Sequence, residues 1–112
     1  MYKRQLAYRA AGRLEEAVPL YERTLADREQ VLGETHPSTL TSRNNLAAVC
    51  QAAGRLDKAI PLFERTLADS ERVLGETHPN TLTSRSNLAY VYQAAGRLDE
   101  AEGLRNRTAP GS

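Results

Sequence analysis

The sequence has no tryptophan, one phenylalanine, one methionine and one cysteine among its 112 residues. Aromatic residues make up 5% of the chain, so a core has to be built mostly from Leu, Ala and Val with a few Tyr side chains. The single Cys50 cannot form a disulfide within the chain. This cysteine usage suits a reducing compartment, and we therefore expect a cytoplasmic location.

An excess of charge of either sign is also missing. The chain carries 15 Lys and Arg against 14 Asp and Glu, for a formal net charge of +1. Such a balance creates no net field that would attract nucleic acid or an anionic membrane. There is no run of about 18 apolar residues to span a bilayer, and the first ten residues lack the apolar middle of a secretory signal. We expect neither nucleic acid nor membrane among the partners.

What the sequence does contain is repetition at a fixed period. The segment GETHP begins at Gly33 and again at Gly75, and ERTLAD begins at Glu22 and Glu64, in both cases 42 residues apart. The segment AAGRL begins at residues 10, 52 and 94 with the same spacing. Self-similarity at such a period indicates a stacked-repeat architecture.

Each repeat is predicted to contain two amphipathic helices. The first helix is expected over 37–53, with Pro37 in its first turn, either Thr35 or His36 as N-cap, and Gly54 as the left-handed residue after it. The second helix is expected over 56–74, where apolar residues follow the 3.6-residue period. The period continues through Pro61, which predicts a slight kink rather than a break.

The same pattern at both ends predicts one domain of three helix pairs. Residues 1–32 form a truncated first pair with helices over 1–11 and 14–32, and residues 33–74 form the complete central pair. Residues 75–108 form a third pair, with helices over 79–95 and 98–107, and residues 109–112 form a tail. The last helix has lost apolar residues, since Arg105 stands at the position equivalent to Phe63. Such a loss is typical of a capping repeat.

No arrangement of residues predicts catalysis, a metal or another cofactor. His36 and His78 occupy equivalent turns and lack the three or four converging ligands of a metal site, so we interpret them as capping residues. Cys50 is interpreted as a small core residue, because it falls on the buried face at the position that Tyr92 takes in the next repeat. Nothing resembles a nucleophile with a base or a phosphate-binding loop, and we predict that the chain is not an enzyme.

The segment NLAAVCQAAGRLDKAIPLFERTL, residues 45–67, resembles the tetratricopeptide repeat in its order of large and small residues. The family's usual period is 34 residues, and a period of 42 is similar to that of kinesin light chain repeats. The resemblance implies an all-α fold in which helical hairpins stack as a right-handed α-solenoid, with the first helix of each pair on the concave side. It further implies a protein–protein interaction scaffold that binds a peptide or protein segment on that concave face.

The resemblance also implies a set of binding residues on the first helices. The candidate peptide-binding residues are Thr41, Asn44, Asn45, Gln51, Thr83, Asn87, Tyr90 and Gln93. Asn45 and Asn87 match the position at which family members use an asparagine to bond a peptide backbone, an amide being both donor and acceptor. The alternative is that both asparagines only solvate the inner face or bond to an adjacent helix.

Arg43 and Arg85 are predicted near the same surface. They can receive an acidic partner. The interpretation we favour is that their stems cover Leu40 and Leu82 while the guanidinium groups pair with a Glu of the next hairpin.

A second function is kept open because the repeats are so alike. In this alternative the chain is a structural self-assembly element whose repeats stack or exchange end to end between chains, giving a homodimer or higher oligomer. The candidate self-association residues are Tyr2, Leu6 and Tyr8 in the short first helix.

Overall fold

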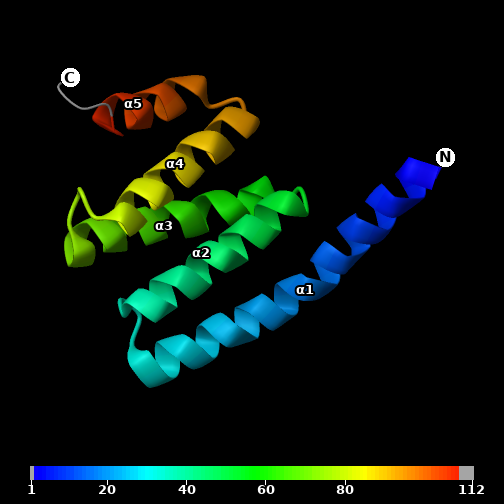
Figure 1. Ribbon diagram of the computed structural model, residues 1–112, viewed down its shortest axis with the longest axis horizontal. Coiled ribbons are helices and arrows are strands. Elements are labelled where there is room, and N and C mark those ends of the chain that lie inside the picture. Colours follow the sequence, from blue (N-terminus) through cyan, green and yellow to red (C-terminus); the bar gives the residue numbers. More distant parts are fainter. Residues whose placement is uncertain (1, 109–112) are drawn as a thin grey trace.

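The computed structural model describes the backbone of residues 2–108 and the side chains of residues 12–107. Within this part the chain forms five α-helices and no strand. They are α1 (Tyr2–Leu32), α2 (Pro37–Ala52), α3 (Leu56–Leu74), α4 (Pro79–Ala94) and α5 (Leu98–Thr108). Figure 1 shows α2 to α5 folding back and forth beside one another, while the amino-terminal half of α1 extends away from them. The all-α fold expected from the sequence is confirmed.

Local sequence explains where α2 to α5 begin and end. His36 and His78 are the N-caps of α2 and α4, and a proline follows each of them in the first turn. Gly54 and Gly96 have φ angles of +81° and +80° in the short turns that follow α2 and α4. Residues other than glycine rarely adopt this conformation, so the AAGRL segments at 52–56 and 94–98 turn at their glycines. The sequence predicted residues 53 and 95 as the last helical residues. In the structure α2 and α4 end one residue earlier, and Ala53 and Ala95 are their C-caps.

The first AAGRL segment does not turn. The sequence predicted separate helices over 1–11 and 14–32, but α1 is continuous and includes Gly12. A helix that folds back after a turn is stable only if it can pack on an apolar face of the helix before the turn. In the central repeat Leu46 belongs to that face and is buried, whereas the first repeat has Arg4 at the equivalent position. Continuing the helix pairs the backbone groups at a cost of about 1 kcal/mol for the interior glycine. Pro19 and Pro61 likewise lie within unbroken helices; the kink at Pro61 stays a prediction.

Packing proceeds along the chain, because α1 packs on α2, α2 on α3, α3 on α4 and α4 on α5. The array measures 48 × 37 × 20 Å, and 20 Å is about the thickness of two helices. Ala47 and Ala59 are completely buried, and their small side chains favour a close approach of α2 and α3, whereas the larger Phe63 and Val91 are also buried in the core. A single apolar core therefore runs through the successive pairs and fixes the spacing of α2 and α4.

Candidate functional site

The two histidine caps set the start of the helices that carry the predicted binding residues. The Nδ1 atom of His36 accepts a hydrogen bond of 3.1 Å from the backbone N–H of Ser38, and His78 accepts one of 3.1 Å from Asn80. Each cap satisfies one of the unpaired N–H groups of a helix N-terminus. The capping interpretation is confirmed, and of the two N-cap candidates the structure selects His36. Because the caps are equivalent, α2 and α4 present equivalent side chains to the same side.

Arg43 is buried, and this corrects the prediction that it lies on the inner surface. Only 1% of its side chain is exposed, and its Nη1 donates to Asp69 Oδ2 of α3 at 2.8 Å. Its Nη2 donates to the backbone carbonyl of Glu34 at 3.0 Å and lies 3.9 Å from the Glu29 carboxylate. A buried guanidinium is tolerated where several acceptors converge on it. Arg43 therefore ties α2 to its own hairpin and to α1, and not to the next hairpin.

The carboxylate of Asp69 is correspondingly shifted. Burial by itself raises the pKa of this carboxyl group, but hydrogen bonds from Arg72 and Arg43 favour the charged form. The net result is a pKa below the ordinary value for aspartate. The pair is a structural element of the central hairpin.

Arg85 is the equivalent residue of α4, and it is less well satisfied. It is 4% exposed and pairs with Glu71 of the preceding α3 at 3.3 Å, whereas its Nε atom has no hydrogen-bond partner among the described residues. The position equivalent to Asp69 is Gly111, which carries no carboxylate. Both arginines are thus unavailable as surface receptors for an acidic partner, contrary to one of the two interpretations of the sequence.

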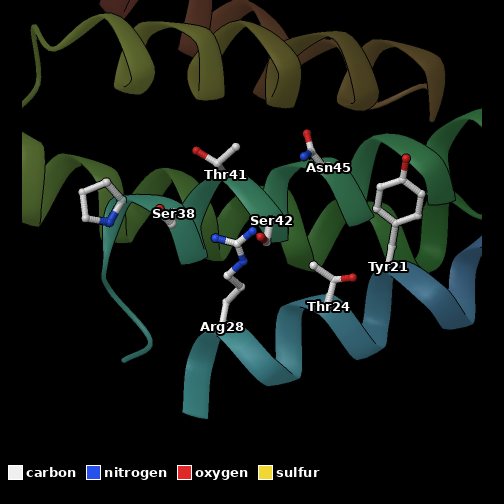
Figure 2. A pocket seen from close by; sticks show the side chains of 8 residues that line it. Tyr21, Thr24, Arg28, Ser38, Thr41, Ser42 and Asn45 are labelled. Carbon is white, nitrogen blue, oxygen red and sulfur yellow. The ribbon is translucent and has the colours of Figure 1, made fainter. Parts of the chain in front are cut away.

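A groove lies between α1 and α2. We call it the α1–α2 groove; its volume is about 360 Å³, and it is lined by Tyr21, Thr24, Arg28, Pro37, Ser38, Thr41, Ser42 and Asn45. Figure 2 shows Tyr21, Thr24 and Arg28 projecting from α1 towards α2, which contributes Ser38, Thr41, Ser42 and Asn45 to the groove. The groove thus offers an aromatic face, a positive charge, hydroxyls and an amide.

A second, smaller groove lies between α2 and α4. Its volume is about 140 Å³, and it is lined by Leu40, Thr41, Asn44, Thr66, Ser70, Leu74, Asn80, Thr83 and Ser84. At one side of it Asn87 Nδ2 donates to Asn44 Oδ1 at 3.5 Å, a long hydrogen bond. Thr41 lines both grooves, so the two adjoin along α2.

The predicted binding residues fall into two groups. Thr41, Asn44, Asn45 and Thr83 line the grooves, and Asn87 contacts Asn44 beside them. Gln51, Tyr90 and Gln93 lie on the same two helices but outside both grooves. Tyr90 is 63% exposed, and Gln93 accepts a hydrogen bond from Arg105 of α5. The side chains of Tyr2, Leu6 and Tyr8 lie outside the described ones.

Sequence reasoning missed the wall that α1 contributes. Tyr21 and Arg28 occupy the positions of Phe63 and Ser70 in the central repeat, each of which is 1% exposed. In α1 the same positions face the groove, and Tyr21 is 38% exposed. The change from a buried Phe and Ser to an amphipathic Tyr and a charged Arg was the signal in the sequence that could have identified an exposed stripe.

Other site classes find little support among residues 12–107. No group of three or more His, Cys, Asp or Glu side chains converges there in the manner of a metal site. Cys50 is 1% exposed, as expected for a core residue, and burial raises the pKa of its thiol. Among the helices of the described residues, none has the length and apolar character needed to cross a membrane.

A family model described as tetratricopeptide repeat matches residues 6–69 and again residues 44–109. The chain belongs to the tetratricopeptide repeat family. The resemblance stated from the sequence is thereby confirmed, and so is its kinesin light chain-like variety. Repeats of this family generally mediate protein–protein interactions and are typically non-enzymatic scaffolds.

Solved structures agree with this assignment. The crystal structure of nearly identical TPR-like repeats of a Podosopora anserina protein assigned as a kinesin light chain has a TM-score of 0.82 and 37% identity, covering 93% of this chain and 50% of that chain. A variant of those repeats has a TM-score of 0.82 and 35% identity, with the same coverage. BtubC (BKLC) from P. vanneervenii, with a TM-score of 0.78, 24% identity and coverage of 87% and 38%, shares the fold.

This tetratricopeptide repeat chain spans half or less of the length of these solved chains. A search of curated proteins finds no match.

Proposed function

We propose that this chain is a protein-interaction scaffold that holds a peptide or protein segment in the α1–α2 groove and along the adjoining faces of α2 and α4. The observation that carries the proposal is the groove itself, about 360 Å³ of open space between two helices, with a lining that is about half polar and half apolar. Sites built on helices hold their side chains in defined positions. We propose no catalytic role, and the cytoplasm remains the expected location.

The chemistry of the groove favours an extended acidic segment. Within residues 12–107 the Arg28 guanidinium takes part in no ion pair, although the chain is rich in carboxylates. A carboxylate on the bound segment would form a charge-assisted hydrogen bond with it. The Asn45 amide is exposed on the opposite wall and can donate to and accept from one peptide unit, while Tyr21 supplies a face for an apolar side chain.

A peptide-library screen read by fluorescence anisotropy tests this proposal. Arg28→Ala is expected to weaken the best acidic hits about tenfold or more, because a charge-assisted bond is lost. The double variant Asn45→Ala plus Asn87→Ala should weaken hits irrespective of their side chains. Arg23→Ala, on α1 but outside the groove, is the matched control. Hits that bind all these variants like the parent would contradict the assignment of the groove.

Self-assembly is the second candidate, and the exposed face of α1 supports it. Leu20 and Val31 of α1 are 67% and 78% exposed, and Tyr21 is open where Phe63 is covered in the central repeat. A helix from a second copy could cover this face as α2 and α4 cover α3, a heterologous contact. Tyr2, Leu6 and Tyr8 remain its proposed contact residues. Light scattering across a concentration series tests the idea, and a strictly monomeric mass at high concentration would exclude it.

A further inference from the structure

A cavity beside Cys50 lies on a different side of α2 from the α1–α2 groove. Its volume is about 310 Å³, and its apolar wall consists of Leu46 and Cys50 from α2 with Pro61 and Leu62 from α3. Glu22 from α1 and Lys58 from α3 also line it. The volume is at the lower end of that of small-molecule pockets. The cavity therefore has room for a single ring.

The next repeat shows which group fits such a place. The position equivalent to Cys50 is Tyr92, whose ring is 6% exposed and packs in the core. The Tyr92 hydroxyl donates a hydrogen bond to the Glu64 carboxylate, and the Arg97 guanidinium lies 4.4 Å from the ring centroid. A phenol ring is thus held there by an apolar floor, a carboxylate acceptor and a cation over its face.

The central repeat keeps part of the surroundings of that ring but not the ring, with Lys58 in place of Glu100 and Pro61 in place of Gly103. Glu22 and Arg55 stand 42 residues before Glu64 and Arg97, and Leu46 stands at the position of Leu88. Cys50 is much smaller than tyrosine, so the space that the phenol takes in the third repeat is open in the central one.

The polar groups at the rim are positioned to accept a hydroxyl. Glu22 lies 3.6 Å from Lys58, with side chains 48% and 45% exposed. Asp57 also lines the cavity, whereas Arg55 does not; Arg55 is 46% exposed and is held by Glu15 at 2.9 Å. Exposed pairs of this kind are weak, so they can rearrange around a ligand at little cost. A phenol hydroxyl could then donate to Glu22 and accept from Lys58.

We propose that the Cys50 cavity binds one phenol ring, with the ring against Leu46, Cys50 and Pro61 and the hydroxyl on Glu22. This site is independent of the peptide groove. The chemistry it selects is a ring that carries a hydrogen-bond donor, presented either by a small phenol or by a tyrosine side chain.

Titration with 4-methylphenol, followed by NMR of the backbone amides, tests the proposal. Saturable shifts are expected at Leu46, Cys50 and Leu62. Toluene and 4-methylanisole should bind about tenfold more weakly or worse, because neither can donate to Glu22. The absence of saturable shifts with 4-methylphenol, or equal binding of toluene, would overturn the proposal. N-acetyl-tyrosinamide distinguishes the two sources, because it binds only if the cavity accepts a ring attached to peptide.

Exchanging residues between the repeats gives matched variants. Cys50→Tyr should fill the cavity, raise the melting temperature and abolish the shifts, whereas Tyr92→Cys should create a second site with shifts at Glu64 and Leu88. Glu22→Gln alters a half-exposed side chain, so the fold is retained, and it should weaken 4-methylphenol about tenfold. Shifts that persist in folded Cys50→Tyr, or binding unchanged in Glu22→Gln, would place the ligand elsewhere.

Discussion

The first and the central repeats share the AAGRL segment, yet the chain turns at one copy and continues as a helix through the other. Gly54 has a φ of +81° between α2 and α3, whereas Gly12 lies inside α1. In the central repeat α3 folds back after Gly54 and packs on α2, where Leu46, Ala47 and Cys50 are buried. The first repeat has Arg4 in place of Leu46. The segment permits both conformations, and the apolar face available to a returning helix decides between them.

The largest difference in stability between the two repeats is expected at equivalent positions of α1 and α3, which hold Tyr21 and Phe63. Phe63→Ala is expected to lower the free energy of unfolding by about 3–5 kcal/mol, because it empties a fully buried site. Tyr21→Ala, at the equivalent but partly exposed position, should cost less than about half as much. Urea denaturation followed by circular dichroism measures both. Equal losses would mean that α1 is covered in solution as α3 is.

The buried arginines test how far a polar network depends on its position in the array. Arg43→Ala should cost about 2–3 kcal/mol, since it removes hydrogen bonds to Asp69 and to the Glu34 carbonyl. Arg85→Ala should cost about 1 kcal/mol, because Arg85 has one long ion pair and an unpaired Nε among the described residues. Denaturation midpoints compare the two, with Arg23→Ala as the surface control. A larger loss for Arg85 would contradict this ranking.

The glycines test the turn directly. Gly54→Ala should destabilise the protein by about 1–2 kcal/mol, because an L-residue is strained at positive φ. Gly12→Ala should stabilise it by about 0.5–1 kcal/mol, because alanine is the better helix former and its Cβ meets no atom within 4 Å. Thermal unfolding of both variants provides the measurement. A destabilising Gly12→Ala would indicate that the chain also turns there in solution.

The third repeat has Tyr92 where the central repeat has Cys50, and the stability that Tyr92 contributes should depend on pH. Burial, followed by the hydrogen bond to Glu64, raises the pKa of Tyr92 to about 12. The unfolded chain loses this proton near pH 10, so the stabilisation is present below pH 10 and is lost as the pH rises towards 12. Tyr92→Phe should cost about 1 kcal/mol at neutral pH and flatten the alkaline loss of stability.

Stability measured between pH 7 and 12 checks the titration of Tyr92. Tyr90→Phe alters an exposed ring on the same helix and serves as the control. An alkaline profile identical in Tyr92→Phe and the parent would show that another group is responsible.

The repeat period and the caps made most of the fold predictable, and long-range partners explain what was missed. The bounds of α3 follow from Leu56 to Leu74 as predicted, because its apolar period is intrinsic to the helix. The burial of Arg43 could not be predicted, because it depends on Asp69, which lies 26 residues away. The α1 wall of the groove was missed for a related reason, since Tyr21 faces the groove only because no described helix covers it.

Each described helix packs mainly on the helices before and after it in the chain, so no single helix holds all the others together. Under tension applied to the two ends of the chain, the hairpins should unfold one after another. The array should therefore lengthen in steps at low force. Refolding after release should be rapid, since neighbours along the sequence are quick to meet.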